Sequence, residues 1–175
     1  MKKENNYAYI DGANLHKGVS SLGWKLDYAR FRVWLTEKYN VSMAYLFVGL
    51  IPKHSNLYKY LQESGFTLVF KEVVYDDKGS PKGNCDADLV LHTVVDTFGE
   101  KSDKIVLVAS DGDYASLVKF LQGKDKLRSI ISPRNADKCS ILLKRTNAKI
   151  AYLNDQRSIL ELVVKEKAPD GDGTS

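Results

Sequence analysis

Cysteine is scarce in this 175-residue chain, which contains only Cys85 and Cys139. The two residues are isolated and do not have the Cys/His spacing of a zinc site. No stretch of the sequence resembles a signal peptide or a membrane span. These absences predict a cytoplasmic protein with reduced thiols and no membrane partner.

The motifs of several enzyme classes are also missing. The sequence has no phosphate-binding loop ending in Gly-Lys-Ser/Thr, no Gly-x-Gly-x-x-Gly after a strand and no Gly-x-Ser-x-Gly nucleophile elbow. Its three histidines, His16, His54 and His92, have no metal-binding spacing. His16, one turn after the first acidic motif, is a minor candidate for the rim of a site. His92 fits a satisfied helix-surface histidine better than a partner of Asp88.

What the chain does contain is three short acidic motifs, Asp11-Gly-Ala-Asn14, Asp86-Ala-Asp88 and Ser110-Asp111-Gly-Asp113. The first and the third follow apolar, β-rich runs, and the carboxyl ends of parallel strands lie along one edge of a sheet. Carboxylates that converge in one pocket repel each other unless a cation is present. Because oxygen ligands favour a hard divalent ion, we expect a Mg²⁺ or Mn²⁺ site at these acids.

Each motif also has a purely structural interpretation. Asp11 and Asn14 suit the N-cap of a helix, and for Asp11 the two interpretations have equal weight. Asp86 and Asp88 suit the first turn of an amphipathic helix. Asp111 and Asp113 form the most specific pair, because a capped turn needs only one acid and the glycine between them relieves crowding.

Alternating strand and helix patterns predict an α/β fold with a mostly parallel sheet, helices on both faces and right-handed crossovers. A stripe of Ala87, Leu91, Val94, Val95 and Phe98 predicts the buried face of one helix. The polar, glycine-bearing loop 76–83 predicts a flexible flap beside the acids. The expected strands are 7–11, 43–48, 67–74, 105–110, 128–132 and 150–153, and the expected helices are 26–39, 53–64, 86–98, 113–122, 137–146 and 156–164.

Basic residues concentrate in one stretch, although the net charge is only +4. Substrate binding and an ordinary solvated surface are equally good interpretations of this stretch, since a basic stripe suits a polyanion. Its members are Lys119, Lys124, Lys126, Arg128, Arg134, Lys138, Lys144 and Arg145.

The sequence resembles the NYN domains, a PIN-like group of metal-dependent ribonucleases. The matching pieces are Tyr9-Ile-Asp11-Gly-Ala-Asn14-Leu, Lys82-Gly-Asn-Cys-Asp86-Ala-Asp88-Leu and the run 107–117 around Ser110-Asp111-Gly-Asp113. The resemblance implies a three-layer α/β/α Rossmann-like (PIN-like) sandwich, here a single domain over residues 1–165. Residues 166–175 lack apolar residues for a core and are expected to be a disordered tail. The resemblance also implies RNA, single-stranded or structured, as the substrate, and Asp11, Asp88, Asp111 and Asp113 as metal-binding catalytic acids, with Asp86 close to the metal.

Our first hypothesis is therefore a metal-dependent endoribonuclease. Asn14 and Ser110 would position the scissile phosphate, while Lys82 and the basic stretch, including Arg134, would hold the strand. The alternative is a non-catalytic module of the same fold that binds RNA or a nucleotide. A third hypothesis is a receiver-like domain, for which Lys149 is the one lysine near the last strand. The sequence leaves open a homodimer, the choice between RNA and DNA and the number of metal ions.

Overall fold

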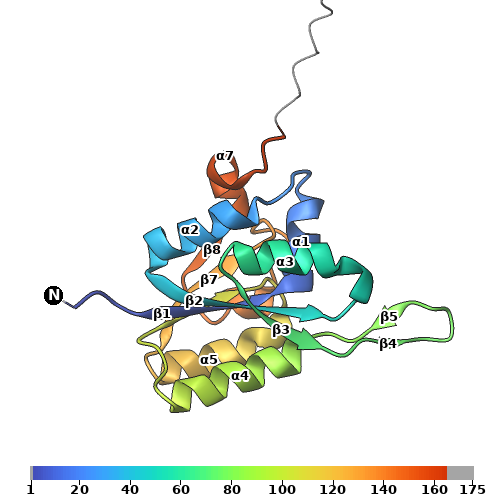
Figure 1. Ribbon diagram of the computed structural model, residues 1–175. Helices are drawn as coiled ribbons and strands as arrows, with labels where there is room; N and C mark the ends of the chain where they lie inside the picture. Colours follow the sequence, from blue (N-terminus) through green and yellow to red (C-terminus); the bar gives the residue numbers. More distant parts are fainter. Residues whose placement is uncertain (1, 165–175) are drawn as a thin grey trace, which may run out of the picture.

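Six strands form the central sheet in the order β3-β2-β1-β6-β7-β8, and every neighbouring pair is parallel (Figure 1). The computed structural model describes residues 2–164, so the tail expected at 166–175 lies outside the described residues. The strands are β1 Asn6–Asp11, β2 Val41–Gly49, β3 Thr67–Lys71, β6 Ile105–Val108, β7 Leu127–Ser132 and β8 Ile150–Tyr152.

Helices cover both faces of this sheet (Figure 1). The expected α/β/α sandwich is therefore confirmed, with a sheet that is parallel throughout. One face carries α1 Gly12–Ser21, α2 Tyr28–Tyr39, α3 Ser55–Glu63 and α7 Arg157–Leu160, and the other carries α4 Asp86–Phe98 and α5 Ala115–Gly123. The shorter elements are α6 Ile141–Lys144, the 3-10 turns η1 Pro52–His54, η2 Gly112–Tyr114 and η3 Leu153–Gln156, and the hairpin strands β4 Val74–Tyr75 and β5 Pro81–Lys82.

The strand sequences explain why the sheet is covered on both sides. All four residues of β6 are buried, as expected for a strand between two helical layers. In β1, Ala8 and Ile10 contribute to the core under α1 and α2, whereas Tyr9 points into the core under α4 and α5. None of the helices within residues 2–164 is long and apolar enough to cross a membrane.

Helix α1 is not among the helices predicted from periodicity, although Asp11 was a candidate N-cap and does cap it. Its segment contains glycines and serines and only two strongly apolar buried residues, Leu15 and Val19. The helix instead packs its backbone closely against the loop after β7, because a Cβ added to Gly18 would lie 2.7 Å from the Cβ of Pro133. The helix is fixed by packing of its backbone, which periodicity does not report.

The predicted buried face of α4 is wrong, although the predicted helix 86–98 has the right ends. Leu91, Val95 and Phe98 are 64%, 58% and 66% exposed, and Ala87 is exposed as well. The buried face consists instead of Leu89, Thr93, Asp96 and Thr97. These polar groups are satisfied, because Asp96 accepts a hydrogen bond from the Tyr9 hydroxyl at 2.8 Å and both threonine hydroxyls donate to carbonyls one turn earlier.

Three further elements differ most from their predicted boundaries. The expected strand 67–74 ends at Lys71, and Val74 belongs to the β4–β5 hairpin. The expected flap 76–83 is part of this hairpin and contains β5. The expected helix 137–146 is reduced to α6, which begins after Ser140 caps it through the Leu142 amide. The expected helix 156–164 is reduced to α7, which ends at Leu160.

Candidate metal centre

The acidic motifs lie where the strand order reverses. β1 and β6 are central neighbours, with β2 and β3 on one side and β7 and β8 on the other. Open α/β sheets bind ligands at such a switch point, beyond the carboxyl ends of the strands. The Asp11 side chain caps α1 at this edge and the Asp111 side chain caps η2, so local helix starts fix both acids here.

Three carboxylates converge at this edge. One carboxylate oxygen from each of Asp86, Asp111 and Asp113 lies within 4.8 Å of the other two. Within residues 2–164, these three side chains form the group that could hold a metal ion. Asp86 is half-buried and Asp113 is exposed. Three carboxylates without a nearby nitrogen or sulfur ligand form a donor set for a hard cation.

Tyr114 connects this group to Asp11. Its hydroxyl lies 2.8 Å from Oδ2 of Asp11 and 3.0 Å from Oδ1 of Asp86. Burial raises the pKa of Tyr114, and the charge of Asp11 adds to the effect, so the phenol stays protonated. One hydroxyl lies between two carboxylates, which ties the first motif to the second through Tyr114, 103 residues after Asp11 in the sequence.

Asp86 is the acid whose titration the site perturbs. Burial is the largest cause of its raised pKa, the hydrogen bond from Tyr114 opposes the shift, and the charges of Asp11, Asp111 and Asp113 add to it. Burial and the neighbouring negative charges therefore disfavour the charged form of Asp86, and a bound cation would relieve that cost.

Asp11 and Asn14 have structural contacts as well as a place at the site. Oδ1 of Asp11 accepts a hydrogen bond from the Asn14 amide at 3.0 Å, and Oδ2 faces Tyr114, so both oxygens are engaged. The side-chain oxygen of Asn14 accepts from the Ser110 amide at 2.8 Å and from its hydroxyl at 3.1 Å. Asn14 therefore fastens the start of α1 to the loop after β6.

Asp88 lies outside the three-acid group and is paired with a residue that sequence reasoning missed. Its carboxylate is 3.2 Å from Nζ of Lys71, which also donates to the Asn84 carbonyl at 2.7 Å. A 270 Å³ pocket adjoins this pair and includes Phe47, Val69 and Cys85 in its wall. Burial raises the pKa of the Cys85 thiol to about 11, so it acts as an apolar wall.

The two other residues predicted to contact the substrate, Lys82 and Arg134, lie on a hairpin and in a loop outside the three-acid group. Lys82 lies on the exposed β4–β5 hairpin, with its Nζ 3.9 Å from Asp76. Arg134 lies in the loop after β7, and the later part of that loop meets the acidic edge where the Ser140 amide donates to the Ser110 carbonyl at 3.0 Å. Neither side chain forms an ion pair or a hydrogen bond with Asp86, Asp111 or Asp113.

The basic stretch 119–145 does not form a single patch, which corrects one interpretation of the sequence. Lys126 donates to the Ser102 carbonyl and Arg128 pairs with Glu4, both at the amino end of the strands. The strand β7 separates these residues from Arg134 and those after it. Lys149 also precedes its strand, β8, so a receiver-like lysine is not at the acidic edge.

The histidines serve other surfaces. Nε2 of His92 is 3.3 Å from Asp96, and its ring lies 4.6 Å from that of Tyr45, so this histidine is satisfied as expected, although it packs against the sheet and not only on the helix surface. His16 lines a cavity on the other face of the sheet. Neither belongs to the acidic group.

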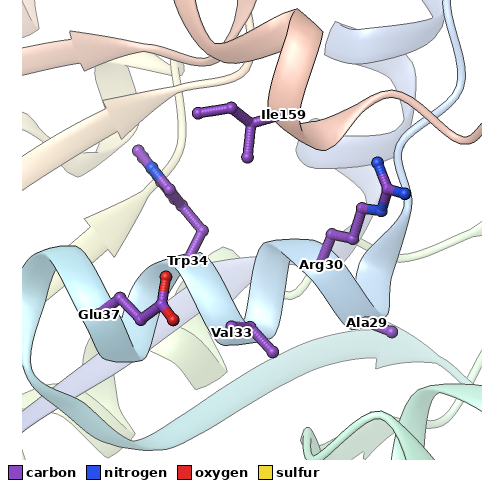
Figure 2. Close-up of a pocket in the computed structure, with 6 residues that line it drawn as sticks. All are labelled: Ala29, Arg30, Val33, Trp34, Glu37 and Ile159. Carbon is purple, nitrogen blue, oxygen red and sulfur yellow. The ribbon is translucent and has the colours of Figure 1, made fainter.

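Another hollow, of about 500 Å³, lies between α2 and α7 (Figure 2). Its side chains are mainly apolar, with Trp34 on α2 facing Ile159 across the gap, and Arg30 is 3.6 Å from Asp27. With Glu37 as its one carboxylate, it does not provide a set of metal ligands.

The fold and the site define the class of this protein: a Rossmann-like α/β/α protein with an aspartate cluster at the switch point of its parallel sheet. The chain belongs to the NYN domain family, whose model matches residues 7–154. It is 27% identical over 163 residues to the low amplitude and bright protein LabA of Synechococcus elongatus, covering 87% of this chain and 86% of LabA.

A solved structure has the same architecture. It is that of a protein of unknown function, VPA0982, from Vibrio parahaemolyticus, with a TM-score of 0.71 and 21% identity. The match covers 91% of this chain and 99% of the other. At this identity the likeness shows the fold alone.

Proposed function

We propose that this protein is a metal-dependent endoribonuclease that hydrolyses RNA phosphodiester bonds. The observation that carries the proposal is the convergence of Asp86, Asp111 and Asp113 within 4.8 Å at the sheet edge. Membership of the NYN family, which is nuclease-like, supports the same activity.

The residues fit Mg²⁺ or Mn²⁺, because every side chain in the group offers carboxylate oxygen and the site raises the pKa of Asp86. Asp86, Asp111 and Asp113 would hold the ion, and Asp11 would support them through Tyr114. When bound, the ion supplies an activated water and stabilises charge on the phosphate oxygens. Asp88 is proposed to orient the water or to join the metal ligands after release from Lys71.

Positive groups beside the acids would hold the RNA backbone. Lys71, with 35% of its side chain exposed, joins Lys82 and Arg134 as a proposed phosphate contact. Asn14 would act on the substrate mainly by holding Ser110 in place, because its side-chain oxygen is already engaged. Single-stranded RNA can reach an exposed edge of this kind without unwinding.

The test is incubation of the protein with end-labelled single-stranded RNA in Mn²⁺, in Mg²⁺ and in EDTA, with Asp111→Asn alongside. Asp27→Asn is the matched control, because Asp27 also caps a helix through its side chain but is the N-cap of α2, outside the acidic group. We expect cleavage in either metal by the wild type and by Asp27→Asn, and none in EDTA or by Asp111→Asn.

Intact RNA in every lane, from protein with native circular dichroism, would contradict the proposal. Metal-dependent retention of that RNA in a filter-binding assay would then identify the non-catalytic binding module instead.

A further inference from the structure

A cavity of about 610 Å³ lies on the face of the sheet opposite α4 and α5. It is enclosed by α1, α3, the segment 24–28, the carboxyl end of β2 and Leu162. Figure 1 shows α1 and α3 as neighbours on this face. Its size is within the range of about 300–1,000 Å³ that is typical of small-molecule sites. Its wall includes none of the acids of the metal centre.

The walls present apolar ring surface with few free polar atoms. The indole Nε1 of Trp24 donates to Oδ1 of Asn154 at 3.1 Å. The Tyr58 hydroxyl donates to the Gly49 carbonyl at 2.9 Å and accepts from the Ile51 amide at 2.9 Å. Because these polar tips are already satisfied, the two aromatic residues offer the cavity only their rings. Leu46 and Leu61, both buried, complete this apolar part.

Basic side chains, and no acidic ones, contribute to the lining of the cavity. They are His16, Lys17, Lys25 and His54. Lys17 and Lys25 are exposed, and neither takes part in an ion pair within the part of the chain that the structure describes. An apolar cavity with unneutralised cations at its edge is complementary to a molecule with an apolar body and an anionic head.

We infer that this cavity binds a small organic anion, with a flat aromatic or apolar body inside and one phosphate or carboxylate at Lys17 and Lys25. Nucleoside monophosphates and medium-chain acyl carboxylates share this chemistry. The inference is independent of nuclease activity, because the cavity lies on a different face from the acids. The site does adjoin the metal centre through Gly12 and Ala13, which follow Asp11 and line the cavity.

Trp24 provides a built-in reporter, since the chain has only two tryptophans, Trp24 and Trp34. In a Trp34→Phe background, the emission of Trp24 would be titrated in EDTA with AMP, decanoate, adenosine and inorganic phosphate. We expect a saturable change with AMP, with decanoate or with both, and none with adenosine or phosphate. Calorimetric titration of the wild type with the same compounds provides the measurement if Trp34→Phe does not fold.

Charge reversal tests the proposed head-group site. Lys17→Glu/Lys25→Glu should weaken binding about tenfold or more, the equivalent of about 1.4 kcal/mol. The matched control, Lys101→Glu/Lys119→Glu, changes the net charge equally at exposed lysines outside the lining and should bind like the wild type. Asp111→Asn should also bind like the wild type, so failure of the nuclease proposal and failure of this one give different results.

Several results would overturn the inference. They are no binding by either organic anion, equal binding of adenosine, and equal weakening by both pairs of substitutions. Binding that is seen only after removal of residues 165–175 would also overturn it, because the end of the chain itself would then be the occupant.

Discussion

Replacement of Asp111 by asparagine separates its two functions, capping and charge. The Asp111 side chain accepts a hydrogen bond from the Asp113 amide at 3.1 Å and so caps η2. Asparagine caps as well as aspartate does, so Asp111→Asn keeps this contact. What it removes is one of the three negative charges that converge at the site.

The size of the effect follows from the geometry. Two unit charges separated by 4.8 Å, the outer limit of the group, repel by about 1 kcal/mol in water and about 3 kcal/mol at the effective dielectric of a protein surface. Because Asp113 is exposed to solvent, the lower figure applies. Without metal, Asp111→Asn should therefore raise the free energy of unfolding by about 1 kcal/mol, or the melting temperature by about 2–4 °C.

The assay is thermal unfolding in EDTA and at a series of Mn²⁺ concentrations. The wild type should gain stability with Mn²⁺ as a ligand-binding native state does, and Asp111→Asn should gain much less. Asp111→Ala loses the cap as well and should be about 1 kcal/mol less stable than Asp111→Asn. Asp27→Asn, the matched cap on α2, should keep the full response to Mn²⁺.

A lower melting temperature for Asp111→Asn than for the wild type in EDTA would refute the reasoning. It would show that Asp111 stabilises the fold through its charge, and that the three acids do not strain the metal-free protein.

Three further predictions concern the same site. Tyr114→Phe removes a buried hydroxyl that donates to charged acceptors and should lower the free energy of unfolding by about 1.5–3 kcal/mol. Urea unfolding in EDTA measures this loss, and an unchanged midpoint would contradict the hydrogen bonds to Asp11 and Asp86. Asp86 has its pKa raised by folding, so its contribution to stability is present below the unfolded pKa and is lost as pH rises through the folded pKa. Asp86→Asn should thus be more stable than the wild type at pH 7 in EDTA, with the difference shrinking toward pH 4, and a difference independent of pH would argue against the shift. Gly112→Ala should cost about 1–3 kcal/mol, because its Cβ would lie 2.5 Å from Oγ of Ser140; circular dichroism melting checks this, and a neutral result would mean that the loop yields.

The fold was predictable because the strands carry their own signal. β6 is an unbroken apolar run that ends just before an acidic turn, and such runs specify buried parallel strands. The face of α4 was not predictable from hydrophobicity. Thr93, Asp96 and Thr97 are buried because each has a hydrogen-bond partner, and two of those partners are carbonyls of α4 itself.

The candidate site was predictable in part for a related reason. Asp11 and Asp111 follow strands of one parallel sheet, so the sequence places them at one edge without knowledge of any contact. Tyr114 is a fully buried aromatic residue, and burial of that kind needs only a core position. Its hydroxyl links Asp11 to Asp86 only because α4 and η2 meet above the sheet. Similarly, Lys71 contacts Asp88 from the separate strand β3. Such contacts depend on how distant elements pack, which local patterns do not encode.

Capping and metal binding do not compete at this site, although the sequence presents them as alternatives. A carboxylate has two oxygens, and in Asp111 one of them accepts the hydrogen bond that starts η2. The cap fixes the rotation of the side chain, which holds the carboxylate toward Asp86 and Asp113 before any ion arrives. Asp11 differs, because its two oxygens are occupied by the Asn14 amide and the Tyr114 hydroxyl. Its contribution is therefore negative charge and orientation of Tyr114, so Asp11→Asn should reduce metal affinity less than Asp111→Asn does.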